Sequence, residues 1–456
     1  MAEMRILFIV FICFLSFSNS IAQEKIEKTM LLADLDSLVS WIDQIHPDMY
    51  ASIGKEKFNM ELEKTRSKIT GDMTAIDFYS IVSPLVSSLG DGHTMMHFPY
   101  MELKNSSDLF FPVTVTINTN DSTVFVDECL VKGENEIPSG SKIISINKVP
   151  IKDIETEMMK YCSGEQYFFK LSIAEYYFTP LLYTIYRKDE FDVEYLENGV
   201  LQSKKINGIG AEERFFTRQN SVKRKMDYYY SFKILPDENV GVIDFVSFVD
   251  LKKFKHFLDS VFTIVNEKNI QNIIIDIRRN GGGNSALGDE FFQYISHVPF
   301  SQFGKTMVKY SDRQHDFYES KKSVRKKQPN GIHTHEADST NLIKLRKSKL
   351  RFNGQVYLLT SHYSFSSAAD FAGAFQHFKM GTIVGEETGG LKVCFGDVIS
   401  QQLPNTKLFF GVSFKKFYLY GANDSDTHGV IPDIIVPADK AMDQTLKLIR
   451  EKTGNE

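Results

Sequence analysis

Three serines mark the point where a predicted strand gives way to a predicted helix, in the stretch SFSSAADFAGAF at residues 364–375. Either Ser364 or Ser366 could cap that helix, which we expect to begin near Ala368, because serine is favoured at helix N-termini. A serine at such a junction could also act as a nucleophile, because the unpaired N–H groups of a helix N-terminus stabilise a developing oxyanion. The small side chains of Ala368 and Ala369 would leave room for a substrate.

A run of three glycines, Gly281–Gly283, follows a second apolar strand in IIIDIRRNGGGNSALGDEF. A strand, glycines and a helix in this order invite a dinucleotide-binding interpretation, but the run lacks the G-x-G-x-x-G spacing. Glycines still let backbone N–H groups approach a ligand closely. The run therefore suits an oxyanion hole as well as a phosphate site.

The stretch SSLGDGHTMMH presents a histidine, His93, directly after a predicted turn at Asp91–Gly92. A lone histidine is usually structural, but histidine is also the commonest general base near neutral pH. His93 and His97 stand four residues apart, yet no glutamate lies between them as in the H-E-x-x-H metal motif. The run HTHE at residues 333–336 is a second weak metal pattern in a predicted loop, so we expect no metal site.

A polar turn near the C-terminus, in YGANDSDTHGVIPDIIVP, carries Asp424, Asp426 and His428. Asn and Asp favour turns for conformational reasons, so this stretch could simply be a polar loop. Its functional interpretation is a carboxylate that orients a catalytic histidine.

The composition indicates a folded protein of two or three domains, with 456 residues, 42% hydrophobic and 24% charged. The net charge of −5 gives no reason to expect nucleic acid as a partner. The N-terminus, MAEMRILFIVFICFLSFSNSIAQEK, has the basic start, short apolar core and small-residue end of a secretory signal peptide covering residues 1–22. We therefore expect export, with no membrane-spanning segment left after cleavage.

Three cysteines follow that segment: Cys129, Cys162 and Cys394. Their spacing fits no metal motif, and an odd number cannot all pair within one chain. A disulfide between Cys129 and Cys162 is one arrangement, and three buried thiols are the favoured one.

The order of predicted elements divides the chain into three parts. Helical periodicity occupies residues 24–89, alternating strands occupy about 109–207, and a long α/β section begins near Tyr228. In the α/β section a helix at 251–269 lies between two buried strands, which predicts a parallel βαβ unit. Residues 305–351 are polar and basic, so we expect a solvated loop or lid there.

Six landmarks in order, LGDGHT, IPSGSKIISINKVP, IDIRRNGGGN, SSAADFAGAF, GEETGG and GVIPDIIV, resemble the C-terminal processing (tail-specific) serine peptidases. The branch resembled includes the tricorn core protease. The resemblance implies a multidomain α/β fold: an N-terminal helical cap at 23–107, a PDZ-like β-rich domain at 108–208, and a crotonase-like catalytic core of ββα-superhelix type at 209–456. Residues 160–186, rich in Tyr and Phe, look like an addition to the PDZ-like domain, which could then serve as a gate.

The resemblance also assigns roles to residues. The family's nucleophile stands three residues before an acidic residue, which selects Ser367, with Asp370 where glutamate is usual. The oxyanion hole would use the N–H of Ala368 and that of Gly282 or Gly283.

Two versions of the family differ in the base. One places a lysine 25 residues after the serine, where this chain has Lys392. The other uses the histidine of the DGH turn, oriented by a carboxylate, and here His93 and Asp426 match. A lysine base needs a large fall in its pKa whereas histidine needs little tuning, and the DGHT turn is characteristic of the second version, so His93 is favoured.

The implied function is that of a secreted serine endopeptidase acting through a Ser367 acyl-enzyme on unfolded proteins or protein C-terminal segments. The alternative is a catalytically inactive protein of the same fold that binds peptides or ligands. The expected partner is a polypeptide, with no nucleic acid, metal or other cofactor; the sequence does not indicate an oligomeric state.

Overall fold

The computed structural model describes residues 24–104, 106–217, 228–321 and 326–453. The predicted signal peptide, residues 1–22, lies outside these ranges. Within them no helix combines the length and apolar character needed to cross a bilayer.

The N-terminal helices are α1 (Lys28–Ile45), α2 (Lys55–Lys68) and α3 (Ala75–Ser87), as the sequence predicted. The apolar face of α1 buries Leu31, Leu35, Leu38 and Ile42, which share one side because they recur at three- and four-residue spacing. A capping box between Thr74 and Asp77 begins α3. A four-residue helix, α4 (Tyr100–Leu103), follows.

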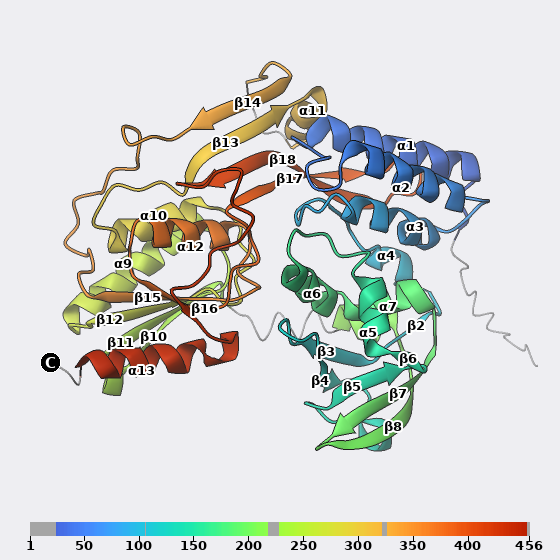
Figure 1. The fold of residues 1–456 in the computed structure, drawn as a ribbon, viewed down its shortest axis with the longest axis horizontal. Coiled ribbons are helices and arrows are strands. Elements are labelled where there is room, and N and C mark those ends of the chain that lie inside the picture. The colour runs from blue at the N-terminus through green and yellow to red at the C-terminus, as the bar shows by residue number, and fades with distance from the viewer. Residues whose placement is uncertain (1–23, 105, 218–227, 322–325, 454–456) are drawn as a thin grey trace, which may run out of the picture.

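The middle region, residues 109–210, is an antiparallel sheet covered by helices (Figure 1). Its strand order is β3-β4-β5-β7-β8, and the predicted addition at 160–186 forms two helices of this region. Cys129 and Cys162 are buried here as free thiols, and Cys394 is buried and free elsewhere. The elements are β2 (Leu109–Phe110), β3 (Val113–Ile117), β4 (Val124–Cys129), β5 (Lys142–Ile146), β6 (Val149–Pro150), α5 (Ile151–Met158), α6 (Tyr167–Tyr176), α7 (Phe178–Tyr186), β7 (Glu190–Glu197), β8 (Val200–Asn207) and β9 (Ile209–Gly210).

The C-terminal region, residues 228–453, is built on a six-stranded sheet in the order β10-β11-β12-β15-β16-β19. All neighbouring pairs are parallel except β10 with β11, which confirms the predicted βαβ unit. Helices α9, α10 and α12 cover one face and α13 the other (Figure 1). The elements are β10 (Tyr230–Leu235), β11 (Val240–Phe245), α9 (Leu251–Glu267), β12 (Asn272–Asp276), α10 (Ala286–Ile295), β15 (Gln355–Thr360), α12 (Ser367–His377), β16 (Thr382–Gly385), β19 (Ile434–Ile435) and α13 (Ala441–Thr453).

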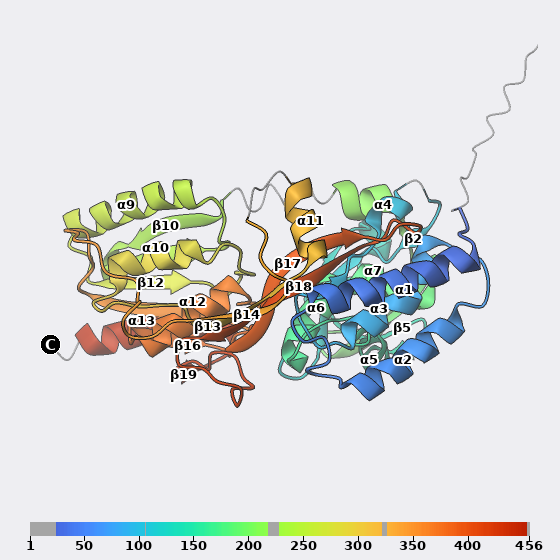
Figure 2. The same cartoon turned by 90° about the horizontal axis from the view of Figure 1, so that it is seen from above.

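A second sheet links this region to the N-terminal helices. Its long hairpin, β17 (Val393–Gln402) and β18 (Phe409–Leu419), runs between the two halves of the molecule (Figure 2). β18 pairs with β1 (Met95–Met96) and with β13 (Phe303–Tyr310), which in turn pairs with β14 (Gly331–Glu336).

The prediction of a solvated loop or lid at 305–351 is therefore wrong for much of that stretch, which holds β13, α11 (Asp312–Ser320) and β14. The side chains of β14 are largely exposed, so the strand has no apolar periodicity to reveal it. Its backbone is instead satisfied by pairing with β13, a long-range contact that local polarity does not report.

Candidate active site

Ser367 is the first residue of α12, and the backbone just before it is strained. Ser366 occupies the N-cap with φ 54° and makes no capping hydrogen bond, and the Ser364 hydroxyl donates instead to the Ile277 carbonyl oxygen at 2.8 Å. Ser366 thus stands at the N-cap as predicted, but its side chain forms no capping hydrogen bond. A positive φ at a non-glycine residue costs on the order of 1–3 kcal/mol and is characteristic of functional sites.

The hydroxyl of Ser367 is buried and hydrogen bonded. It donates to the Gly283 carbonyl oxygen at 2.8 Å, and it lies 2.9 Å from the Ser285 hydroxyl, which is left to act as the donor to it. No local pattern predicts the role of Ser285, because the contact spans 82 positions.

The glycines predicted for the oxyanion hole lie against the serine. A Cβ at Gly282 would stand 2.8 Å from the Ser367 nitrogen, and both Gly282 (φ 97°) and Gly283 (φ 140°) have backbones that favour glycine. The Gly282 N–H donates to Asn280 Oδ1, and the Ala368 N–H donates to the Phe365 carbonyl oxygen. The Gly283 N–H donates to no group in the described ranges.

The structure brings His93 to the same place. Its imidazole is stacked on the ring of Phe365, two residues before Ser367, with centroids 4.5 Å apart and planes at 27°. Both ring nitrogens are buried, and neither has a well-formed hydrogen bond within the described part of the chain. The segment that carries His93 therefore packs against the segment just before Ser367. The two side chains are not hydrogen bonded to each other.

Asp91, two residues before His93, is the buried centre of a hydrogen-bond network. Its Oδ1 accepts from the His93 backbone N–H at 2.8 Å, and its Oδ2 accepts from the hydroxyls of Thr94 and of Ser413, the latter at 2.7 Å. His46 Nε2 lies 3.3 Å from the same Oδ2. Burial opposes ionisation of Asp91, but the hydrogen bond from His46 and the neighbouring donors hold its pKa well below its usual range.

This network fixes the turn that carries His93 to two distant elements: the segment after α1 through His46, and β18 through Ser413. The local sequence predicts Asp91 only as a turn residue. Nothing local could have shown that it receives donors from 45 positions upstream and 322 positions downstream.

The charge state of His93 suits a general base. Burial lowers its pKa from the usual 6.5, and the carboxylates of Asp91 and Asp397 offset part of that shift. The nearest carboxylate contact is Asp91 Oδ1 to His93 Nδ1, at 3.8 Å. At neutral pH the ring is therefore uncharged and can accept a proton.

Two further acids are buried close to this network. Burial, together with the charge of Asp91, raises the pKa of Glu165 to about 8. Burial and the charge of Asp397 raise the pKa of Asp370 well above its usual value. One carboxyl oxygen of each has no hydrogen-bond partner among the described residues, and Cys394 lies within electrostatic reach of Asp370, Glu165 and Asp91. No motif in the sequence predicts a role for Glu165.

The other two predicted site residues, Asp426 and Lys392, form hydrogen bonds with the turn at 423–428. Asp426 accepts the Asn423 N–H at 2.9 Å within its own turn. Lys392 is held by its backbone, whose N–H donates to the His428 carbonyl oxygen at 3.0 Å. Neither side chain forms a hydrogen bond or ion pair with Ser367 or His93 in the described structure.

The middle region covers this site from one side. Phe169 of α6 stacks on Phe365 at 4.1 Å, and Phe168 stacks on His362 at 4.1 Å. The Gln166 side-chain amide donates to the Thr427 carbonyl oxygen at 2.8 Å, in the turn that holds Asp426. α6 and the residue before it thus contact both the segment just before Ser367, at residues 362–365, and the turn that holds Asp426.

Across the ranges that the structure describes, no three His, Cys, Asp or Glu side chains gather closely enough to hold a metal ion. His333 instead has its Nε2 2.9 Å from the Pro329 carbonyl oxygen.

Residues 239–436 match the model of peptidase family S41. The chain carries a peptidase family S41 domain. It is accordingly a serine-type peptidase, and its substrate is a polypeptide. The matched residues contain Ser367 and the glycine run, whereas His93 lies outside them in the N-terminal part of the chain.

Comparison with solved structures reaches beyond that domain. Mature CPAF superposes with a TM-score of 0.65 at 13% identity, over 94% of this chain and 98% of CPAF. The photosystem II D1 C-terminal processing protease gives a TM-score of 0.42 at 14% identity, over 90% and 93%. A putative S41 protease from Bacteroides fragilis NCTC 9343 gives 0.41 at 12% identity, over 92% and 97%. At 13% identity the likeness to CPAF shows a shared fold over nearly the whole chain.

Proposed function

We propose that this S41 peptidase is an exported endopeptidase that cleaves unfolded proteins or the C-terminal segments of proteins through an acyl-enzyme on Ser367. The observation that carries the proposal is the strained turn at Ser366. It leads Ser367 into the first turn of α12 and against Gly282, two residues after Phe365, on whose ring the buried His93 imidazole is stacked. Export rests on the apolar N-terminal segment at 1–22.

His93 is the proposed base. It takes the proton of the Ser367 hydroxyl while Oγ bonds to the carbonyl carbon of the substrate, whose C=O electron pair moves onto oxygen. The protonated imidazole then gives that proton to the departing amine as the C–N bond breaks. Water, deprotonated by the same imidazole, hydrolyses the ester and releases Ser367. The hydroxyl must first turn from the Gly283 carbonyl toward His93.

The proposed oxyanion hole uses the Gly283 N–H, which donates to no group among the described residues, with that of Ala368 or Gly282. The latter two are engaged within the chain, so substrate must draw one of them away from its present acceptor. Such donors are worth about 3 kcal/mol each in the transition state.

The domain organisation that we propose is a helical cap at 23–107, a PDZ-like domain at 108–208 and a crotonase-like catalytic core at 209–456. The antiparallel sheet of the middle region and its contacts through α6 support a module that both binds peptide and gates the site.

Fluorophosphonate labelling tests the nucleophile and the base together. We expect the wild type to be labelled, Ser367→Ala to be unlabelled, and His93→Ala to lose at least about a hundredfold in rate. Lys392→Ala is the matched control and should keep the wild-type rate. Loss of labelling in Lys392→Ala with retention in His93→Ala would transfer the role of base to the lysine.

A further inference from the structure

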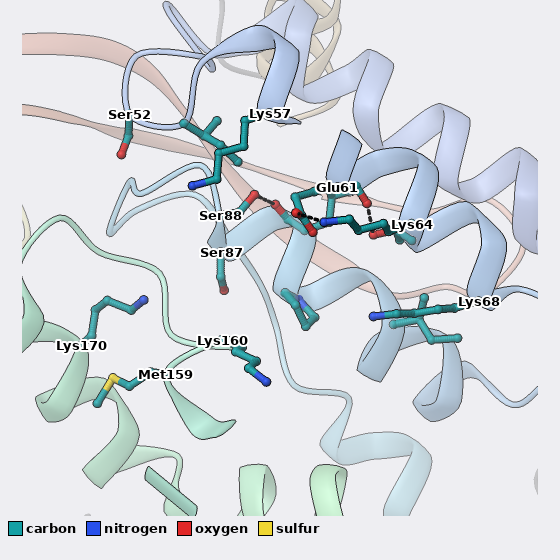
Figure 3. A pocket seen from close by; sticks show the side chains of 15 residues that line it. Ser52, Lys57, Glu61, Lys64, Lys68, Ser87, Ser88, Met159, Lys160 and Lys170 are labelled. Carbon is teal, nitrogen blue, oxygen red and sulfur yellow. Dashed lines mark hydrogen bonds and ion pairs between the residues drawn. The ribbon is translucent and has the colours of Figure 1, made fainter. Parts of the chain in front are cut away.

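A cavity of about 430 Å³ lies between the N-terminal helices and the middle region, apart from Ser367 and His93 (Figure 3). Its lining contains five lysines and a single acidic residue. They are Lys57, Lys64, Lys68, Lys160, Lys170 and Glu61. Because the whole chain carries a net charge of −5, this concentration of positive charge is not a reflection of composition.

Most of these ammonium groups are not neutralised by the protein. Lys64 pairs with Glu61 at 2.6 Å, and Lys160 pairs with Glu157 at 2.6 Å. Lys57, Lys68 and Lys170 form no ion pair with any residue in the described ranges. Lys170 is partly buried, and burial lowers its pKa, so an anion beside it would relieve an unfavourable environment.

The lysines come from two walls. Lys57, Lys64 and Lys68 follow one face of α2, where positions seven and eleven residues apart align over about 16 Å. Lys160 and Lys170 face them from the middle region (Figure 3). Apolar atoms of Pro84, Leu85 and Met159 form other parts of the lining.

We propose that this pocket binds an acidic segment of a polypeptide, with carboxylates on the lysines and apolar side chains against the uncharged lining. The inference rests on the proposed function, since the segment would belong to a substrate. A row of charges about 16 Å long exceeds what one phosphate spans, and the lining offers no arginine for bidentate phosphate binding. A volume of 430 Å³ is that of an ordinary ligand pocket, larger than one small anion needs.

The pocket is connected to the active site through the chain. Ser87 and Ser88 line it at the end of α3, and the turn that leads to His93 follows at once. Lys170 follows Phe169, the residue stacked on Phe365. A bound segment would therefore hold its polypeptide beside both elements that meet at the serine.

Fluorescence anisotropy tests this in the Ser367→Ala background, so that no probe is cleaved. The probe is a short fluorescein-labelled peptide rich in glutamate and leucine, compared with its glutamine counterpart. We expect the glutamate peptide to bind at least about tenfold more tightly, and Lys57→Gln/Lys68→Gln to remove about that factor. The matched control is Lys252→Gln/Lys268→Gln, the same charge change at the exposed start and C-cap of α9, which should bind normally.

Equal affinity for the two peptides, or an equal loss in the control variant, would overturn the proposal. Displacement of the peptide by inorganic phosphate, beyond that caused by chloride at the same ionic strength, would also overturn it in favour of a phosphate site. Labelling of the wild type without peptide binding would refute the pocket alone. Peptide binding without Ser367 labelling would instead refute the proposed catalytic function and leave the binding site standing.

Discussion

Asp91 is the residue on which the geometry around His93 depends most directly. Its carboxylate is 1% exposed and receives donors from three side chains and one backbone N–H. Because the pKa of Asp91 is lowered in the folded state, its ionised carboxylate stabilises the fold at pH values above its usual pKa of 3.8. That stabilisation is lost as the pH falls through the folded-state pKa.

We predict that Asp91→Asn lowers the free energy of unfolding by about 3 kcal/mol, because a neutral amide cannot satisfy the same set of donors. Urea denaturation at pH 7 measures this. The labelling rate of Ser367 should fall as well, since the backbone of His93 is held by the same carboxylate.

The variant Asp426→Asn distinguishes between Asp91 and Asp426 as the carboxylate that orients His93. Among the described residues, the Asp426 carboxylate accepts a hydrogen bond only within its own turn, so this variant should leave the free energy of unfolding unchanged. If Asp426 moves to the imidazole when substrate binds, the labelling rate will drop without a change in stability. An Asp91→Asn protein as stable and reactive as the wild type would contradict the role given to Asp91.

At the scale of elements, the segment that leads into α6 carries an acid whose carboxyl group is buried. Glu165, just before α6, has its pKa raised to about 8 by burial beside Asp91. Because the pKa of Glu165 is raised in the folded state, protonated Glu165 contributes fully to the free energy of unfolding at pH values below its usual pKa of 4.5. That contribution is lost as the pH rises to about 8.

We therefore predict that Glu165→Gln, which mimics the protonated acid, flattens the decline of stability between pH 4.5 and 8. Urea midpoints measured across this range give the readout. Glu267→Gln on the exposed end of α9 is the matched control and should follow the wild type. Parallel curves for Glu165→Gln and the wild type would show that Glu165 is not held protonated.

The elements that the sequence predicted correctly are those whose own pattern is strong. The parallel strands β11 and β12 are continuous apolar runs, and α1 has a clear three-to-four periodicity. The stretch GIHTHE has neither, and becomes β14 only because β13 lies beside it. The type of an element can thus be predicted where its own residue pattern determines which side chains are buried. It cannot be predicted where pairing with a strand distant in the sequence forms the element.

The site divides in the same way. Ser367, the glycine run and His93 stand at turns that the sequence marks by residue type. The structure also places Ser285 and Glu165 in the site and makes Asp91 the centre of a hydrogen-bond network. These roles depend on contacts between segments that are far apart in the sequence, so no local pattern predicts them.

At the scale of the whole molecule, the hairpin β17–β18 joins the serine's region to the histidine's. At the hairpin tip, Asp34 of α1 accepts the Thr406 N–H at 2.7 Å and the Asn405 N–H at 3.1 Å. Farther along, Phe410 is fully buried among the N-terminal helices and faces Trp41, with ring centroids 6.3 Å apart. The N-terminal helices therefore complete a core to which the C-terminal hairpin contributes.

We predict that Phe410→Ala lowers the free energy of unfolding by about 3–5 kcal/mol and also slows labelling of Ser367. The loss should spread because β18 also carries Ser413, the donor to Asp91. Hydrogen exchange should show α1, α3 and the hairpin losing protection together. Phe409→Ala is the matched control, because the adjacent Phe409 side chain is 48% exposed. This substitution should change the free energy of unfolding by no more than about 0.5 kcal/mol. If Phe410→Ala loosens the helices while Ser367 keeps its reactivity, the two regions are not coupled through the hairpin, and His93 must be positioned by other contacts.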